Sequence, residues 1–436
     1  MPASPERLLL SSVLRQGDLK TAIAHGVTAD MFHEFSDEWV WLEGYFRKFN
    51  KVPSKATFVG KFSDFRVVQA DDTVYLTEEV KKKHVQTVLI ERLGEVAEAV
   101  ADGDVDTAVR IMNSSIVQVS GSVGHAGDSD IFTDFADVLA EVESRHERAK
   151  TSGSAGIPYG IKTLDEVTGG QNPGELIIVA ARLGQGKSWI MQYLAAMASA
   201  SGHSVVFNAL EQTRMQVATR IHALLSGCVY EKVYNAKNPT GAFNSNHLQR
   251  GQDFSLIDYR RFLRDLKAKV PGQLNVSDVS RGRVSTMTIA GQIERHQPDI
   301  LYVDYITLLQ KSGPDWQGVA ELSSDLTQLS TRYQIPVVAA AQLNREHGLG
   351  KDPAGPEAIA QADAIGQDAS LVLTFRQWSK HVLAGRVAKN RNGEGDARFY
   401  LEFRPGEGII REVSFNKAQD IMDQDKDEAA ALEDAK

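Results

Sequence analysis

A glycine-rich segment in the middle of the chain has the residue types and the spacing that bind nucleotide phosphates. It follows an apolar run at 176–180, precedes a helix-compatible run at 189–200, and reads Ala181-Arg182-Leu183-Gly184-Gln185-Gly186-Lys187-Ser188. In such a loop, backbone N–H groups and the positive end of the next helix surround the phosphates, while a lysine reaches the β and γ phosphates and a hydroxyl binds Mg²⁺. We therefore predict that ATP and Mg²⁺ bind here, with nucleotide contacts from Arg182, Gly184, Gln185, Gly186, Lys187, Ser188 and Trp189.

The loop motif by itself is weak support, because Gly-Lys-Ser also arises by chance and Ala181 stands where such loops usually begin with glycine. Support comes from the strand before it, the helix after it, and a second acidic site downstream. Asp304 provides that site. It ends the apolar run 300–303, and at the carboxyl end of a parallel strand a carboxylate can hold magnesium and its water.

Two further side chains follow predicted strands of the same sheet. Glu211 comes directly after the run 205–210, where it could act as the general base that polarises an attacking water. It could equally be an acid that only stabilises a helix N-terminus. Gln342 follows the run 337–341, and its amide could contact both the γ-phosphate and a nearby nucleic-acid loop.

Lys389 and Arg391 are two cations separated by one residue near a strand end. Their side chains point the same way at that spacing, which suits a phosphate clamp supplied across a subunit boundary. Taken alone, the same segment would be a solvated turn.

Length and composition are those of a globular protein with more than one domain. The chain has 436 residues, of which 42% are hydrophobic and 24% charged, a net charge of −9 and one cysteine. No run is long and apolar enough to cross a membrane, and no N-terminal signal is present, so we expect a cytoplasmic protein without membrane association. A single cysteine excludes a zinc ribbon and an internal disulfide. The acidic net charge argues against a wholly basic DNA-binding surface but leaves room for a local basic channel.

The predicted strands and helices must bring these residues together. Apolar strand-like runs alternate with helical runs over 156–416, which predicts an α/β fold with a mainly parallel sheet, helices on both faces and antiparallel strands at the end. Residues 1–120 read as a helical N-terminal domain. Residues 121–155 read as a linker with a short amphipathic helix, whose stripe would dock on its own domain or on a neighbouring subunit; its members are Phe135, Val138, Leu139 and Val142. The acidic segment 417–436 reads as a frayed helix or a solvated tail.

Six motifs in this order resemble the DnaB-type replicative DNA helicases. They are the run Gly156–Gly160 with Thr168-Gly169-Gly170, the loop that begins with Ala181, Leu210-Glu211, Val303-Asp304-Tyr305, the run Ala341–Arg345, and the run Ala388–Gly393. The resemblance implies a RecA-like core in a homohexameric ring that moves 5′ to 3′ on single-stranded DNA at a replication fork. It further implies that Lys187 and Ser188 hold phosphate and magnesium, that Asp304 holds magnesium, that Glu211 activates water, that Gln342 senses the γ-phosphate, and that Lys389 and Arg391 act on the neighbour's nucleotide.

The chain departs from the family pattern in its expected DNA-facing loop, 344–356 and beyond. Ala360 stands where the family usually has arginine, which leaves Arg345 and Lys351 as the candidate DNA contacts. A separate primase and a separate helicase loader are the implied partners, and the compact, diverged chain would suit a phage-encoded or plasmid-encoded version. Two other functions stay open: a RecA-like recombinase that forms filaments, and a non-catalytic ring that scaffolds a primase or loader.

Overall fold

The computed structural model describes residues 4–70, 72–104, 107–108, 111–112, 115, 135–235, 237–238, 241–278, 280, 282–310, 315–343, 353–355 and 363–434. The chain divides into two compact units, Met1–Phe135 and Ala136–Lys436. Each unit has its own hydrophobic core. Within the described part of the chain, every helix is too short or too polar to span a lipid bilayer.

The first unit is helical. Its helices include α1 (Pro5–Gln16), α2 (Leu19–Ala24), α3 (Ser36–Phe49), α4 (Lys55–Lys61) and α5 (Thr73–Ala101). α5 begins where the Asp72 carboxylate accepts hydrogen bonds from the N–H groups of Val74 and Tyr75, because such a cap satisfies donors that a helix start leaves free. In α3, Trp39 and Leu42 are buried in the core of this unit, whereas Phe49 at the end of the helix is exposed.

The second unit contains a nine-stranded sheet of order β3-β2-β4-β5-β1-β6-β7-β8-β9. The six strands from β3 to β6 pair in parallel, and β7, β8 and β9 continue the sheet in antiparallel fashion. Their bounds are β1 (Leu176–Ala181), β2 (Ser204–Ala209), β3 (Gln273–Asp278), β4 (Ile300–Asp304), β5 (Val337–Gln342), β6 (Leu371–Ser379), β7 (Val382–Asn390), β8 (Arg398–Arg404) and β9 (Ile409–Val413).

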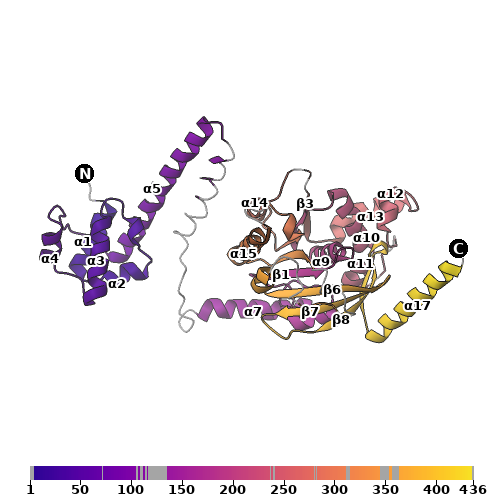
Figure 1. The fold of residues 1–436 in the computed structure, drawn as a ribbon. Helices are drawn as coiled ribbons and strands as arrows, with labels where there is room; N and C mark the ends of the chain where they lie inside the picture. Colours follow the sequence, from indigo (N-terminus) through magenta and orange to yellow (C-terminus); the bar gives the residue numbers. More distant parts are fainter. Residues whose placement is uncertain are drawn as a thin grey trace. The chain divides into compact units, whose positions relative to one another are not determined.

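Helices cover both faces of this sheet (Figure 1). One core lies under α9 (Lys187–Ala200), α10 (Arg214–Ser226), α11 (Cys228–Tyr234) and α13 (Leu256–Lys269). The other lies under α14 (Thr286–His296) and α15 (Asp315–Tyr333). The remaining helices are α7 (Phe135–Ser152), α8 (Lys162–Thr168), α12 (Ser245–Arg250), α16 (Asp363–Asp368) and α17 (Phe415–Asp434). Strands buried on both faces are expected to be apolar runs without alternation, and β1, β4 and β5 are of this kind.

The predicted fold class is confirmed, and two details differ from expectation. β3 was not predicted, because this half-exposed edge strand lacks the continuous apolar run of the buried strands. The acidic C-terminal segment is a helix that begins at Phe415, as one of the two expectations had it, but it is not simply solvated. Its first half does not lie free in solvent, since Ala418 and Ile421 are buried against Val382, while its second half extends away from the sheet (Figure 1).

Candidate nucleotide-binding site

The loop between β1 and α9 requires glycine at two positions. Gly184 and Gly186 have φ of 76° and 79°, in the left-handed region that side chains disfavour. At Gly186 a Cβ would also lie 2.5 Å from Cζ of Phe403. α9 begins at Lys187, so the N–H groups of its first turn are available to phosphate oxygens, which the helix dipole also attracts.

Lys187 lies between an aromatic ring and two acids. Its Nζ is 3.9 Å from the centre of the Tyr305 ring. Burial lowers the pKa of the Lys187 ammonium, whereas the negative charges of Asp304 and Glu211 act in the opposite direction. The ring face and the two carboxylates therefore favour a cation at the start of α9, next to the phosphate loop.

Asp304, the last residue of β4, is buried and has one unsatisfied oxygen. Burial raises the pKa of its carboxyl, and the Lys187 charge and a hydrogen bond with Ser188 oppose that increase. Among the described residues, Oδ1 of Asp304 has no hydrogen-bond partner. A buried carboxylate oxygen without a donor is costly unless a cation binds it. Together with the Ser188 hydroxyl, it offers the oxygen ligands that Mg²⁺ prefers, so these residues fit the metal.

Glu211 reaches the same place from β2. The N–H of Leu210 donates to the carbonyl of Asp304 at 2.9 Å, which joins the ends of β2 and β4. Gln212 accepts a hydrogen bond of 2.9 Å from Nε2 of Gln192, a buried residue of α9. Glu211, between Leu210 and Gln212 in the chain, is exposed. Its charge acts on both Lys187 and Asp304.

Gln342 lies at the same edge of the sheet. It is the exposed last residue of β5 and pairs with Ala181 in the parallel register of β5 and β1. The strand order thus brings the ends of β1, β2, β4 and β5 together, as expected where ligands bind a parallel sheet.

Arg220 also belongs to this site, although no motif pointed to it. Its Cζ lies 4.7 Å from the centre of the Trp189 ring, in the first turn of α9. Burial lowers the pKa of its guanidinium, and the charges of Asp304 and Glu211 oppose the shift. The available signal was the capping box of Thr213 and Gln216, which starts α10 just after Glu211 and so places Arg220 in the second turn of a helix that leaves the site.

Lys389 and Arg391 lie toward the amino ends of the parallel strands, opposite the edge that carries the phosphate loop. β7 runs antiparallel to β6, and Lys389 pairs with Val372 near the start of β6. The end of β1 is level with Phe375, three residues further along β6, which is about 10 Å at strand spacing. The structure therefore does not bring these two cations to the phosphate loop of their own chain.

The two cations contact the last carbonyl groups of α16. Lys389 Nζ donates to the carbonyls of Gly366 and Gln367 at 2.8 and 2.9 Å. Arg391 Nη2 donates to Gln367 at 3.1 Å and to Asp368 at 3.4 Å. Cations at a helix C-terminus are favoured by the helix dipole. Burial lowers the pKa of Lys389, and the nearby Arg391 charge lowers it further.

The candidate DNA contacts Arg345 and Lys351 lie outside the described residues, as does Ala360. The short described piece of that loop, 353–355, is attached to the strands that follow it. Thr374 Oγ1 donates to the carbonyl of Ala354 at 2.6 Å, and Arg386 Nη1 donates to the carbonyl of Pro353 at 3.4 Å. These three residues therefore lie against β6 and β7.

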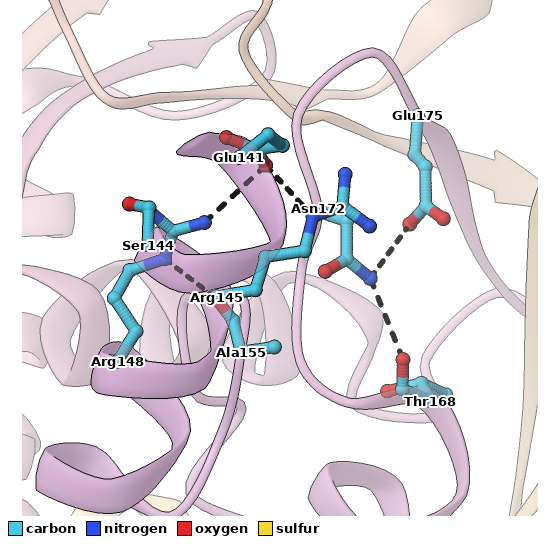
Figure 2. A network of polar contacts seen from close by, with 8 residues as sticks. All are labelled: Glu141, Ser144, Arg145, Arg148, Ala155, Thr168, Asn172 and Glu175. Atoms are coloured by element: carbon cyan, nitrogen blue, oxygen red, sulfur yellow. Dashed lines mark hydrogen bonds and ion pairs between the residues drawn. The ribbon is translucent and has the colours of Figure 1, made fainter. Parts of the chain in front are cut away.

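The amphipathic helix of the expected linker is α7, and its apolar stripe is exposed. Phe135, Val138, Leu139 and Val142 are 50–62% exposed. The C-terminal part of α7 is held to the second unit by Arg148, whose Nε donates to the carbonyl of Ala155 at 2.7 Å, as Figure 2 shows. We expected this stripe to dock either on its own domain or on a neighbouring subunit. The structure does not show it packed on its own domain.

Comparison with known proteins agrees with this geometry. Residues 156–406 match the family described as the DnaB-like helicase C terminal domain. A replicative DNA helicase DnaB of Leifsonia xyli subsp. xyli is 28% identical over 318 residues, which are 67% of this chain and 64% of that protein. One of Geobacillus stearothermophilus is 25% identical over 350 residues, 75% of this chain and 72% of that protein. This chain therefore covers a little less than two thirds of the Leifsonia relative.

Two solved structures share the fold. One is reported as a DnaB-like replicative helicase and its interactions with primase; it has a TM-score of 0.64 and 18% identity, and the match covers 94% of this chain and 99% of that one. The other is reported as an ATPase domain; it has a TM-score of 0.53 and 19% identity, and the match covers 66% of this chain and 100% of that one.

Proposed function

We propose that this chain, which belongs to the DnaB-like helicase family, hydrolyses ATP to move along single-stranded DNA as a homohexameric ring. The observation that carries the proposal is the separation of Lys389 and Arg391 from the phosphate loop. One edge of the sheet presents Lys187, Asp304 and Glu211, and the opposite edge presents two cations. A cation clamp on the γ-phosphate is then supplied by the next subunit, so that each complete site lies at a subunit interface.

Within one subunit the residues have distinct tasks. The loop N–H groups and Lys187 bind and orient the phosphates. Ser188 and Asp304 would hold Mg²⁺, which when bound would neutralise charge on the phosphate oxygens. Glu211 accepts a proton from the attacking water, while Gln342 contacts the γ-phosphate and transmits its presence toward the loop that follows β5. Arg220, stacked on Trp189, adds a positive charge beside Asp304 and Glu211 and stabilises the negative charge that develops on the phosphates.

The exposed stripe of α7 supports assembly into a ring. An isolated apolar stripe on a soluble helix indicates a protein contact. Head-to-tail contacts of one kind close into a ring when the rotation between subunits allows it, and a contact made by α7 on the next subunit is of that kind. The single-stranded DNA then passes through the ring and is contacted by the loop at 344–356, with Arg345 and Lys351 on phosphates.

The finer parts of the proposal follow from the family. The ring moves 5′ to 3′, unwinds duplex DNA at a bacterial replication fork in the cytoplasm, and works with a separate primase and a separate loader. A strand-displacement assay on partial duplexes that carry either a 5′ or a 3′ single-stranded tail tests the direction. Unwinding only with the 3′ tail would contradict it.

Mixing two inactive variants tests the arrangement in trans. Lys187→Ala lacks a working phosphate loop, and Arg391→Ala lacks a working clamp, so each should hydrolyse ATP very slowly alone. In rings mixed randomly from equal amounts, about a quarter of interfaces pair an intact loop with an intact clamp, and activity should return to that extent. Exchange of subunits is monitored by native mass spectrometry. Inactive mixtures in which exchange is demonstrated would contradict a clamp in trans.

Electron microscopy with DNA and an ATP analogue distinguishes the alternatives. Closed six-membered rings support the helicase, whereas long helical filaments would indicate a recombinase. A ring without ATP hydrolysis in the presence of DNA would indicate a scaffold.

A further inference from the structure

The turn that carries the two cations is held from two sides. On one side, the last carbonyls of α16 accept hydrogen bonds from Lys389 and Arg391. On the other side, Nδ2 of Asn392 donates to Oε1 of Glu175 at 2.7 Å. The backbone between these contacts is also fixed, because the N–H of Arg391 donates to the carbonyl of Ser370 at 2.9 Å and the N–H of Asn392 donates to Oδ1 of Asn390 at 3.2 Å.

Glu175 is itself firmly placed in the fold. It directly precedes β1, its N–H donates to the carbonyl of Asn172 at 3.4 Å, and its carbonyl accepts from the N–H of Val337 at 2.9 Å. The other carboxylate oxygen, Oε2, accepts from Nδ2 of Asn172 at 3.5 Å. Asn172 Nδ2 also contacts the carbonyls of Gly170 and Thr168. Figure 2 shows Asn172 between Thr168 and Glu175.

The pKa of the Glu175 carboxyl is raised by its surroundings. Burial raises the pKa of its carboxyl, and hydrogen bonds from Asn392 and Asn172 together with the charge of Arg145 act against that increase. Arg145 belongs to α7 and pairs with Glu141 at 2.7 Å, and its side chain extends toward Asn172 in Figure 2. A half-buried carboxylate that accepts amide hydrogen bonds on both oxygens is a rigid anchor, because each bond to a charged acceptor is stronger than one between neutral groups.

We propose that Glu175 is a positioning residue for the cationic turn: through Asn392 it fixes the backbone of Arg391 so that this side chain reaches the nucleotide of the neighbouring subunit. This inference rests on the proposed function, in which the turn acts in trans. Glu175 directly precedes β1, whereas the phosphate loop follows the opposite end of that strand. Its effect should therefore belong to the subunit that supplies the turn and not to the subunit that supplies the phosphate loop.

Placement of Glu175→Ala in one or the other partner of the mixing experiment tests this directly. The reference mixture contains Lys187→Ala subunits, which supply only the turn, and Arg391→Ala subunits, which supply only the loop. With Glu175→Ala added to the Lys187→Ala subunit, the restored hydrolysis should fall about 10-fold to 100-fold, since a misplacement of about 1 Å can cost that much. With Glu175→Ala added to the Arg391→Ala subunit, it should equal the reference.

Two further variants separate positioning from folding. Glu175→Gln keeps an oxygen that accepts the hydrogen bond from Asn392. In the Lys187→Ala subunit, this variant should allow hydrolysis within about threefold of the reference mixture. A small loss is expected because a neutral hydrogen bond is about half as strong as a charged one. Asn392→Ala should reproduce the loss seen with Glu175→Ala, and the double variant should lose no more than either single one, as expected for two residues that act through one contact. Glu166→Ala, at an exposed position of α8, is the matched control and should change nothing.

The possible outcomes are distinguishable. An equal loss from Glu175→Ala in either partner would show that the residue only supports the fold, and no loss in the turn-supplying partner would show that it does not position the turn; either result overturns the inference and leaves the proposed function intact. An inactive reference mixture overturns the clamp in trans, and the role of Glu175 with it.

Discussion

The guanidinium carbon of Arg220 lies 4.7 Å from the centre of the Trp189 ring. This contact joins α10 to the first turn of α9 and holds a positive charge beside Asp304 and Glu211, the two acids of the nucleotide site. Arg220→Ala should therefore lower the rate of ATP hydrolysis about 100-fold, the lower end of what one preorganised group contributes. Arg220→Lys should not restore it, because lysine does not reproduce the planar stacking. The measurement is steady-state ATPase, with Arg264→Ala on α13 as control; an unchanged rate in Arg220→Ala would exclude a role for this residue.

Lys187→Ala should abolish ATP hydrolysis, because the β and γ phosphates lose the cation that orients them. The fold should survive, since Lys187 lies at the helix start and not in the core. ATPase assays and circular dichroism check both statements. A residual rate above about a tenth of wild type would contradict the assignment of the phosphate loop, because positioned phosphate ligands are worth far more than that.

Glu211→Gln should bind ATP normally and hydrolyse it slowly. Only the activation of water is lost, and general-base contributions amount to about 10² to 10⁴ in rate. Equilibrium binding of a fluorescent ATP analogue and single-turnover hydrolysis measure the two effects separately. If binding and turnover fall together, Glu211 supports the structure of the site and not the chemistry.

Leu139→Asp should prevent ring assembly. Leu139 lies in the middle of the exposed stripe of α7, and a charge there would be buried without a partner when α7 docks on the next subunit. Native mass spectrometry should show monomers or small oligomers in place of hexamers. Glu143→Ala, at an exposed position of the same helix, is the control. Hexamers that persist in Leu139→Asp would indicate that subunits associate elsewhere.

Arg345→Ala and Lys351→Ala should each weaken binding of single-stranded DNA and reduce its salt dependence, since every neutralised phosphate of a single strand contributes a slope of about 0.7. ATP hydrolysis without DNA should be preserved. Fluorescence anisotropy at several salt concentrations provides affinity and slope. Unchanged values in both variants would move the DNA contacts away from the loop at 344–356.

The sequence by itself was enough for the fold class and for the nucleotide edge of the sheet. Strands buried on both faces appear as apolar runs, and the residue that ends each run lies at the carboxyl edge of a parallel sheet; Lys187, Glu211, Asp304 and Gln342 could be placed together on that basis.

Only the tertiary structure decided which long-range contacts surround these residues. Arg220 stacks on Trp189, Lys389 and Arg391 bind the carbonyls of α16, and Glu175 holds Asn392, a residue 217 positions away. No periodicity or spacing encodes such pairs, because they depend on strand order and on the packing of side chains from separate elements. β3 is a different case. Pro271-Gly272 and the alternation of polar and apolar residues mark this strand in the sequence, but it lacks the continuous apolar run by which the buried strands were predicted.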